Sequence, residues 1–536
     1  MSETRIQYRK LRAPRDHRSA FIDPPLSESH QLLQENQSFI QQSGDFQIFG
    51  QPLGTLRLAA RKDLLTAAVE HTGSYTNLND QVNSELIFLS GHQPKLFHPG
   101  VWFKNILLAQ LAKKHAATAI NLIIDNDLCG QRSIKVPQGS FESPTVRLMS
   151  YDCDGENLPF EEVSIMDQGL FESFGEQVAN ACIDGTANHV RDFWTLVTES
   201  NTLNIGLKFA QARHQMEQQH GIQNLELPLS MICSSRGFLR FCCHLLSNAR
   251  QLQTIYNTSL KEYRQLHKIR SHSHPVPALE CNSDAIEIPL WIWSHQSPTR
   301  KRLFCSTVGD KTQLLDEFGN TYGTIKLSTS DDSTIDQLDE LAKSGIKIRP
   351  RALTTTMYCR LVLSDLFLHG IGGAKYDQLT DHITTKFFQC RLPRFQTATA
   401  TVKLFANQLS NPAEKLESIE KDLRDLEFSP EKFARKAIKN NHRQSLELEK
   451  LIQEKLRHIR KEVAPKDRAA WHETLQNLHR KLRTLLAQDE QTLTISRQTF
   501  QNQLKAFNLL DSREYSLILF NAKTLLELLE SATKTP

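Results

Sequence analysis

A strand–loop–helix–strand pattern around residue 100 constrains the fold of this chain more than any other feature. Residues 86–89 form a short apolar run, residues 90–100 form a loop rich in Gly and Pro, and residues 101–115 have the pattern of an amphipathic helix. A second apolar run covers residues 119–124. Two continuously apolar strands on either side of a helix are typical of a βαβ unit in a parallel sheet. We therefore predict an α/β fold with a Rossmann-like parallel sheet at its core.

Composition and charge exclude several classes of protein. The 536 residues include 64 Lys and Arg and 60 Asp and Glu, so the net charge is only +4 and is spread along the chain. A dedicated nucleic-acid binder concentrates positive charge in one region, so we expect no nucleic-acid partner. The first 21 residues are polar and charged, and no window approaches the ~18 apolar residues of a membrane span, so we expect no membrane partner. Ten cysteines without a C-x-x-C pair favour reduced thiols and a cytoplasmic protein.

Changes in composition divide the chain into four segments. We predict an N-terminal wrap at residues 1–80 and an α/β core at residues 81–410, with an insertion at about residues 130–225. Residues 411–495 are rich in charge, and residues 496–536 end the chain with a strand-like apolar run that we expect to return to the core.

The charged segment shows a helical repeat. Apolar residues recur at spacings of three and four on both sides of Pro465. This pattern is typical of helices that pack along a seam. We predict that the segment is a long antiparallel coiled-coil hairpin of two helices, inserted into the core.

The loop after the first strand holds the strongest candidate site. Gly91 permits close approach of the backbone, while His92, Gln93 and Lys95 supply a titrating base, an amide and a fixed cation. The N-terminus of the following helix favours an anionic or phosphate-bearing ligand. The alternative is a tight loop whose polar groups satisfy one another.

Two carboxylates follow the second strand, at Asp125 and Asp127. The carboxyl ends of parallel strands meet at one edge of a sheet, where α/β proteins bind ligands. There the two carboxylates can hold hydroxyls, an amine or a cation. Acidic residues after a strand are equally ordinary turn formers, and the sequence favours neither interpretation.

A second candidate for anion binding lies between residues 346 and 388. Its chemistry-bearing residues are Arg349, Arg351, Tyr358, Gly372, Gly373 and Lys375. Planar guanidinium groups match carboxylates and phosphates, and two glycines at the start of a helix expose backbone N–H groups. The alternative is helix capping with close packing. In this segment we predict a helix through residue 368, a glycine loop and a second helix.

A basic segment follows residue 262. It contains Arg264, His267, Lys268, Arg270, His272 and His274. The histidines lack a Cys or carboxylate at a zinc-like interval, so we predict no metal site. The segment is consistent with a basic rim for an anionic substrate and equally with a solvated loop.

Taken in order, these segments resemble the bacillithiol-biosynthesis cysteine-adding enzyme (BshC) family. The resemblance rests on SGHQPKLFHPG after the first strand, IIDND after the second, IRPRALTTTMY with HGIGGAKYDQLTD, and the charged helical segment. The chain departs from the family where Ser90–Gly91–His92–Gln93 stands in place of Thr-Gly-Gln-Gln, and where the Pro-Gly-Glu after the paired glycines is absent. The first motif also resembles the start of WbqC-like proteins of sugar pathways, through Phe97, Gly100 and Lys104.

The resemblance implies a Rossmann-like site, a nucleotide as an additional ligand, and a homodimer formed through the coiled coil. It also implies the addition of an amino acid, cysteine in that family, to a sugar-linked acceptor. We therefore hypothesise a ligase-like enzyme that joins an amino acid or another amine to a carboxylated or sugar-linked acceptor. The alternative hypothesis is a non-catalytic protein that binds a ligand and recruits a partner through the coiled coil.

The hypothesised reaction assigns a role to each group. Amide formation needs a neutral amine, an activated acyl group and stabilisation of the developing oxyanion. We expect His92 to take the amine proton, and Lys95 and Arg351 to hold anionic parts of the substrates. The backbone N–H groups of the paired glycines would face the developing negative charge, and the two aspartates would bind ammonium or hydroxyl groups.

Overall fold

The structure is a computed structural model that describes residues 11–533 except 79–81, 83–84, 184–186, 271–275, 283 and 441. The chain separates into two compact units. One contains residues 1–136, 147–404 and 513–536, and the other contains residues 137–146 and 405–512. The candidate site residues all belong to the first unit.

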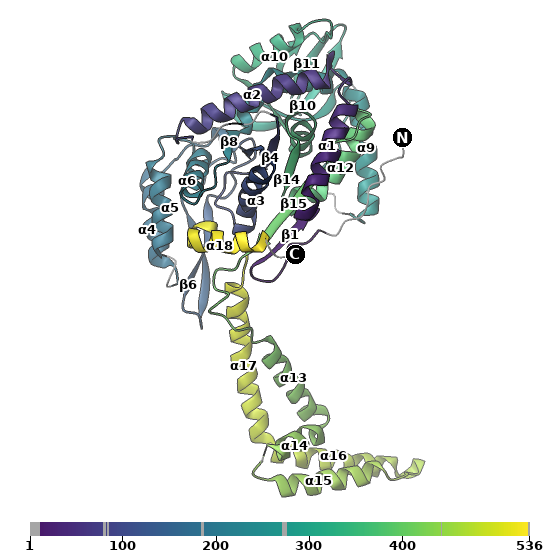
Figure 1. Cartoon of the computed structure of the whole chain (residues 1–536). Coiled ribbons are helices and arrows are strands. Elements are labelled where there is room, and N and C mark those ends of the chain that lie inside the picture. Colours follow the sequence, from purple (N-terminus) through teal and green to yellow (C-terminus); the bar gives the residue numbers. More distant parts are fainter. Residues whose placement is uncertain are drawn as a thin grey trace. The chain divides into compact units, whose positions relative to one another are not determined.

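The first unit is built on a six-stranded mixed sheet (Figure 1). In spatial order its strands are β1 (Ser19–Asp23), β15 (Phe395–Thr401), β14 (Leu366–His369), β4 (Ile87–His92), β5 (Thr118–Ile123) and β8 (Leu225–Pro228). All neighbouring pairs are parallel except β1 with β15. The prediction of an α/β fold is confirmed, with a mixed sheet of mostly parallel strands.

The crossovers leave the centre of this sheet in opposite directions. From β4 the chain passes through α3 (Pro99–His115) to β5 on one side, and from β14 it passes through α12 (Ile371–Phe387) to β15 on the other. Right-handed crossovers that diverge in this way place their helices on opposite faces. Packing agrees, because Leu379 of α12 shares a buried cluster with Leu89, whereas Phe88 contacts the ring of His115 in α3.

The strand β14 corrects one prediction. We expected a helix through residue 368, but the helix α11 (Ala352–Tyr358) ends early, a π-helical turn follows at Cys359–Leu363, and Leu366–His369 pairs with β4 and β15. Four apolar residues carry no periodicity that separates a short buried strand from a helix. The missed strand is central to the sheet.

A second, antiparallel sheet belongs to the same unit. Its strands, in spatial order, are β12 (Thr321–Ile325), β11 (Lys311–Leu315), β10 (Ser297–Val308), β9 (Ile286–Ser294) and β13 (Ile346–Pro350). Arg302 pairs with Trp291 across β10 and β9. Two short hairpins complete the strands, β2 (Gln47–Ile48) with β3 (Gln51–Pro52) and β6 (Ser133–Gly139) with β7 (Pro144–Ser150).

Helices cover these sheets. The remaining helices of the unit are α1 (Ser29–Gln42), α2 (Leu53–Gly73), α4 (Gln168–Ala181), α5 (Ala187–Glu199), α6 (Ile205–Gln219), α7 (Leu229–Ile232), α8 (Arg236–Ser247), α9 (Ala249–Leu266), α10 (Ser333–Lys343) and α18 (Ala522–Thr533). Short 3₁₀ turns lie at Leu26–Glu28, Phe160–Glu162 and Leu517–Leu519. The apolar run at residues 514–520 is therefore a turn before α18, and the strand expected there is wrong.

The second unit is helical apart from residues 137–146, which form the tip of the β6–β7 hairpin. Its helices are α13 (Ala413–Phe428), α14 (Pro430–Lys439), α15 (Ser445–Ile459), α16 (Arg468–Leu485) and α17 (Ala487–Leu510), with a 3₁₀ turn at Pro465–Asp467. α13 packs against α17, and α15 packs against α16 around Leu448, Ile452 and Leu482. The chain thus forms several shorter helices where we expected two long ones, and the coiled-coil hairpin is not confirmed.

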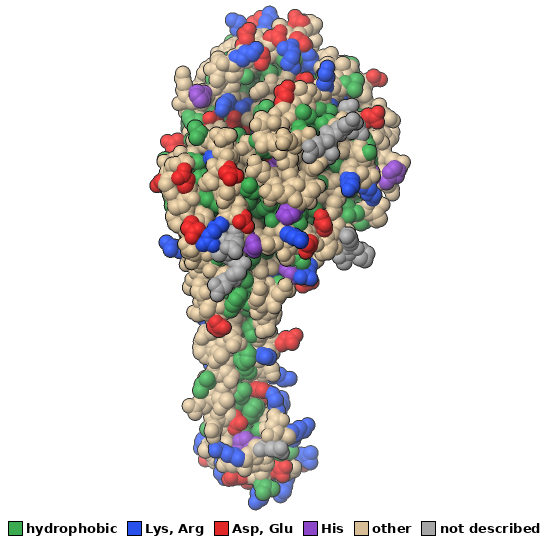
Figure 2. Space-filling model, turned by 60° about the vertical axis from the view of Figure 1, so that its left-hand side comes forward, with side chains coloured by type: hydrophobic (Ala, Val, Ile, Leu, Met, Phe, Trp, Pro, Cys, Tyr) green, Lys and Arg blue, Asp and Glu red, His purple; other side chains and the backbone are tan. Residues whose placement is uncertain are grey.

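Two observations concern possible nucleic-acid and membrane partners: the distribution of surface charge and the character of the helices. On the face drawn in Figure 2, acidic and basic side chains are interspersed. Among the described helices, none combines the length and the apolar character needed to cross a membrane.

Candidate functional site

The centre of the site is the point where β4 and β14 end side by side. Ligands of doubly wound sheets bind outside the strand ends at the place where the crossovers diverge, and here that place lies between these two strands. The loop that starts at Gln93 leaves β4, and Gly370 leaves β14 and begins the approach to α12. Two loops that are far apart in the sequence therefore form neighbouring walls.

Lys104 of α3 reaches between these walls. Its Nζ donates a hydrogen bond of 2.7 Å to the carbonyl oxygen of Gly91, and its Cε lies 3.8 Å from the position of a Cβ built on Gly370. The side chain is only 5% exposed, and burial lowers its pKa to about 8. A Cβ built on Gly372 would meet no atom within 4 Å, so the first turn of α12 borders open space. The ammonium group of Lys104 thus lies beside the residue that precedes the N-terminus of α12.

His92, the last residue of β4, has a protein oxygen next to each ring nitrogen, and because both oxygens are acceptors a neutral ring donates to only one of them. Its Nε2 lies 3.1 Å from Asn105 Oδ1, and its Nδ1 lies 3.2 Å from Gln93 O. Since Asn105 Nδ2 donates to Glu217, the amide oxygen faces His92 and the proton belongs on Nε2. Burial, together with the charges of Arg213 and Lys104, keeps the pKa of His92 well below its ordinary value. His92 is therefore neutral and fixed in orientation.

The neighbouring loop residues bind the turn after β5. Gln93 Nε2 donates to Asp127, and Arg300 Nη1 lies 3.1 Å from the other carboxylate oxygen of Asp127. Lys95 is half-buried, with its Nζ 5.8 Å from the centre of the Phe160 ring. The Asp127 carboxylate is thus shared between the loop after β4 and strand β10.

Asp125 is the group at this edge whose acidity is most useful for proton transfer. It is 4% exposed and accepts hydrogen bonds from the backbone N–H (2.9 Å) and the hydroxyl of Ser230, which follows the neighbouring strand β8. Burial and the nearby charge of Glu161 raise the pKa of Asp125 to about 7, against the lowering effect of the Ser230 hydrogen bonds. A carboxyl with this pKa can exchange a proton at neutral pH.

The two arginines at the end of β13 have different surroundings. Arg349 forms a two-point ion pair with Glu161, at 2.9 Å for each bond, and its charge is therefore neutralised. Arg351 donates from one nitrogen to Glu287 at 2.6 Å and stacks on Trp291, 4.3 Å from the ring centre. Its Nε and Nη1 are buried without a hydrogen-bond partner among the described residues, so they retain the capacity to bind an anion.

Direct bonds join this arginine segment to the turn after β5. Asn126 Nδ2 donates to the carbonyl oxygen of Pro350 at 2.7 Å, and the backbone N–H of Glu161 donates to the carbonyl oxygen of Asp125 at 2.8 Å. The structure therefore brings the predicted residues 125–127 and 349–351 together.

The other predicted residues are placed differently. Tyr358 is 1% exposed and packs against Phe238 and Phe241 in the core, so it does not face this edge. Lys375 is exposed on α12. Gly373 is required by packing, because a Cβ there would lie 2.5 Å from Nδ1 of His369.

Sequence reasoning missed four residues that shape this edge: Lys104, Glu161, Ser230 and Arg300. Lys104 left a signal, since a lysine within an almost wholly apolar helix needs a polar partner. The other three belong to segments distant in the chain, and no local pattern marks them.

No group of three or more His, Cys, Asp or Glu side chains in the described part of the chain is arranged to hold a metal ion. His272 and His274 of the basic segment lie outside the described residues.

Comparisons with known protein families and with curated proteins do not identify a relative of this chain. No model of a known protein family matches the sequence, and no curated protein matches it.

Proposed function

We propose that this chain is a ligase-like enzyme that condenses an amino acid, with cysteine as the first candidate, or another amine with a carboxylated or sugar-linked acceptor. One observation carries the proposal: Lys104 is buried between the ends of β4 and β14, where the crossovers diverge and the N-terminus of α12 begins. A buried ammonium group and free helix N–H groups stabilise a carboxylate, a phosphate or a developing oxyanion.

The proposed roles follow from the contacts. Lys104 and the first turn of α12 hold an anionic group of the acceptor, and Arg351 offers two unused donors to another. Asp125, hydrogen-bonded to the half-buried Ser230 hydroxyl, receives the proton that the amine loses as its nitrogen attacks the acyl carbon, and the activating group leaves that carbon with the electron pair of the bond that breaks. His92, being neutral and bonded to Asn105 through its Nε2 proton, fixes the end of β4 against α3 where the Gln93 loop begins.

The resemblance to the cysteine-adding family supports the substrate class. It also leads us to propose a Rossmann-like nucleotide site as the source of acyl activation and a homodimer formed through the helical unit as a coiled coil. All ten cysteines are free, which fits a compartment where thiols stay reduced, and we place the activity in the cytoplasm.

A strain that lacks this protein provides the test. Low-molecular-weight thiols labelled with a thiol-reactive fluorophore and identified by mass spectrometry should lose one sugar-linked species, and mass spectrometry of the unlabelled extract should show accumulation of its thiol-free precursor. The wild-type gene and Lys113→Met, which changes an exposed lysine of the same helix, should restore the profile. Lys104→Met should not restore it. An unchanged thiol profile in the deletion strain refutes the proposed substrate class.

One observation favours a non-catalytic ligand-binding protein instead. Several polar groups of the edge are already paired with one another, as Arg349 with Glu161 and Gln93 with Asp127. If the purified protein binds the precursor by calorimetry, while precursor, cysteine and nucleotide together give no product, the binding function is the correct one.

A further inference from the structure

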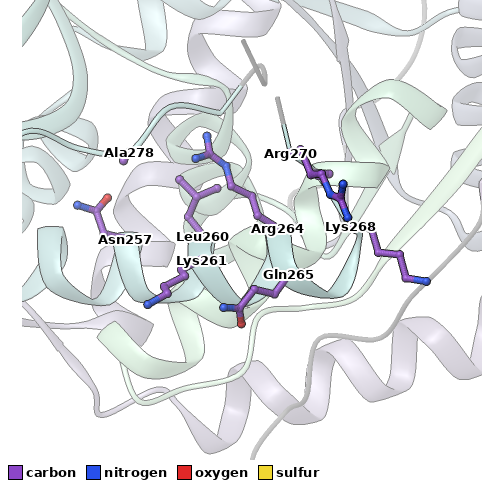
Figure 3. Close-up of a pocket in the computed structure, with 9 residues that line it drawn as sticks. Asn257, Leu260, Lys261, Arg264, Gln265, Lys268, Arg270 and Ala278 are labelled. Carbon is purple, nitrogen blue, oxygen red and sulfur yellow. The ribbon is translucent and has the colours of Figure 1, made fainter. Parts of the chain in front are cut away.

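A cavity at the end of α9 is lined mainly by basic side chains. Its volume is about 530 Å³, within the range of small-molecule sites. The lining residues, drawn in Figure 3, are Asn257, Leu260, Lys261, Arg264, Gln265, Lys268, Ile269, Arg270 and Ala278. The cavity is separate from the edge where β4 and β14 end, because none of the residues discussed there lines it.

The walls of the cavity are held in place by hydrogen bonds. The side chain of Asn257 both donates to and accepts from the backbone of Leu279, at 2.8 Å in each case. Arg264 Nη2 donates to the carbonyl oxygen of Val276 at 2.9 Å. These bonds fix the segment that contains Ala278 against α9, so the cavity is formed before any ligand arrives.

The positive charge of the cavity is not neutralised. Among the described residues, no carboxylate pairs with Lys261, Arg264, Lys268 or Arg270. The acidic residue within this stretch, Glu262, is directed elsewhere, since its carboxylate bonds to His382 and Lys386 of α12. Arg264 also keeps a buried Nε without a hydrogen-bond partner in the described part of the chain.

Lys268 occupies a backbone position that usually belongs to glycine. α9 ends in a Schellman motif, in which the N–H of Ile269 bonds to Arg264 O and the N–H of Lys268 bonds to Gln265 O. Lys268 has a φ of 54°, the left-handed conformation that favours glycine at this position. The chain therefore carries a cation at the cavity in spite of an unfavourable backbone conformation.

From this arrangement we infer a second ligand site, independent of the proposed function: the cavity binds a small molecule that carries a pyrophosphate-like group of adjacent negative charges. Four cations within ten residues match two adjacent anionic groups, and arginine can bind phosphate oxygens in pairs. Leu260, Ile269 and Ala278 offer apolar contact to the rest of the molecule. Nucleic acid is a poorer match because the basic residues line a small cavity and do not extend into a track.

The test is calorimetric titration of the full chain with inorganic pyrophosphate, at 50 and 200 mM salt. We expect saturable binding that weakens with salt and is at least tenfold tighter than binding of inorganic phosphate. Lys268→Gly removes the cation and places the favoured residue in the Schellman motif. It should bind at least tenfold more weakly, with a thermal midpoint equal to or above that of the wild type.

Arg270→Gln and Arg250→Gln form a matched pair. Both replace an exposed arginine of the same region, but Arg250 lies at the opposite end of α9 and does not line the cavity. Arg270→Gln should weaken binding about tenfold, whereas Arg250→Gln should leave it within twofold. The inference is overturned if pyrophosphate gives no saturable binding, if both arginine variants lose affinity equally, or if a 20-nucleotide RNA binds more tightly and displaces pyrophosphate.

Discussion

Asp125→Asn gives the sharpest test of the chemistry assigned to the sheet edge. In the folded protein the pKa of Asp125 is raised from 3.8 to about 7, chiefly because burial disfavours its charged form. A shift of about 3 pKa units corresponds to roughly 4 kcal/mol. The folded state therefore pays about that free energy to keep Asp125 ionised above pH 7. Asparagine has nearly the same shape, can still accept the backbone N–H of Ser230, and carries no charge.

The sign of the effect depends on pH. Below about pH 4 the carboxyl is protonated in both states and contributes no difference. As the pH rises from about 4 to about 7, only the unfolded state loses the proton easily, so the stability of the wild type falls. The free energy of unfolding of Asp125→Asn should exceed that of the wild type by about 4 kcal/mol at pH 8 and by about 2 kcal/mol at pH 5.

Urea denaturation followed by tryptophan fluorescence measures this difference. Trp471 is the tryptophan of the second unit, so a Trp471→Phe background confines the signal to the unit that contains the site. Asp63→Asn, which removes an exposed carboxylate of the same unit, should show no pH-dependent gain. If Asp125→Asn unfolds at the same or a lower urea concentration than the wild type at both pH values, Asp125 does not have the acidity required for the proton transfer assigned to it.

Two further predictions concern packing and assembly. Gly373→Ala should lower the free energy of unfolding by about 1–3 kcal/mol, because its Cβ would lie 2.5 Å from His369 Nδ1. Gly372→Ala, which meets open space in the same helix, should be neutral or stabilising by up to about 1 kcal/mol in the same urea titration. Equal effects of the two variants would contradict the contact. For the proposed homodimer, light scattering of the wild type should give twice the chain mass of 61.2 kDa, and the double variant Leu446→Glu/Ile495→Glu should give 61.2 kDa. Both side chains are exposed and apolar in the helical unit, and we expect them to lie in the contact between the two protomers. A wild-type particle of 61.2 kDa would refute the dimer itself.

The predictable part of the fold was the part encoded locally. The first βαβ unit combines two apolar runs with a helix of normal length, and each signal is contained within about 15 residues. β14 could not be found in this way, since four buried residues between two helices become a strand only because β4 and β15 supply hydrogen-bond partners on both sides. Likewise, the heptad-like spacing around Pro465 indicated helices but not the breaks that produce α14 and α15.

The same difference between local and long-range signals applies to the residues of the candidate site. The placement of Asp125 and Asp127 at the end of a buried strand could be predicted from the local pattern, whereas their binding of a ligand, which the sequence left open, stays a prediction. Their partners could not be predicted, because Ser230 reaches Asp125 through the pairing of β5 with β8, and Arg300 reaches Asp127 from β10 of the second sheet. Arg349 and Arg351 look equivalent in the sequence. In the structure, a two-point ion pair with Glu161 neutralises Arg349, whereas Arg351 keeps two nitrogens without a hydrogen-bond partner among the described residues.

The assignment of the proton-transfer group shows why residue type alone misleads. In water, histidine titrates near neutrality and aspartate does not, so the sequence favours His92 as the base. Burial disfavours charge in both residues, and this single effect acts in opposite directions: it lowers the pKa of the histidine, whose charged form is a cation, and raises that of the carboxyl. At this edge both side chains are nearly inaccessible to solvent, so the acidity suited to neutral pH moves from His92 to Asp125. If Asp125 is the proton acceptor, its acidity depends on burial and not on Ser230, whose hydrogen bonds lower its pKa, so a variant that exposes Asp125 to solvent should turn over more slowly at neutral pH.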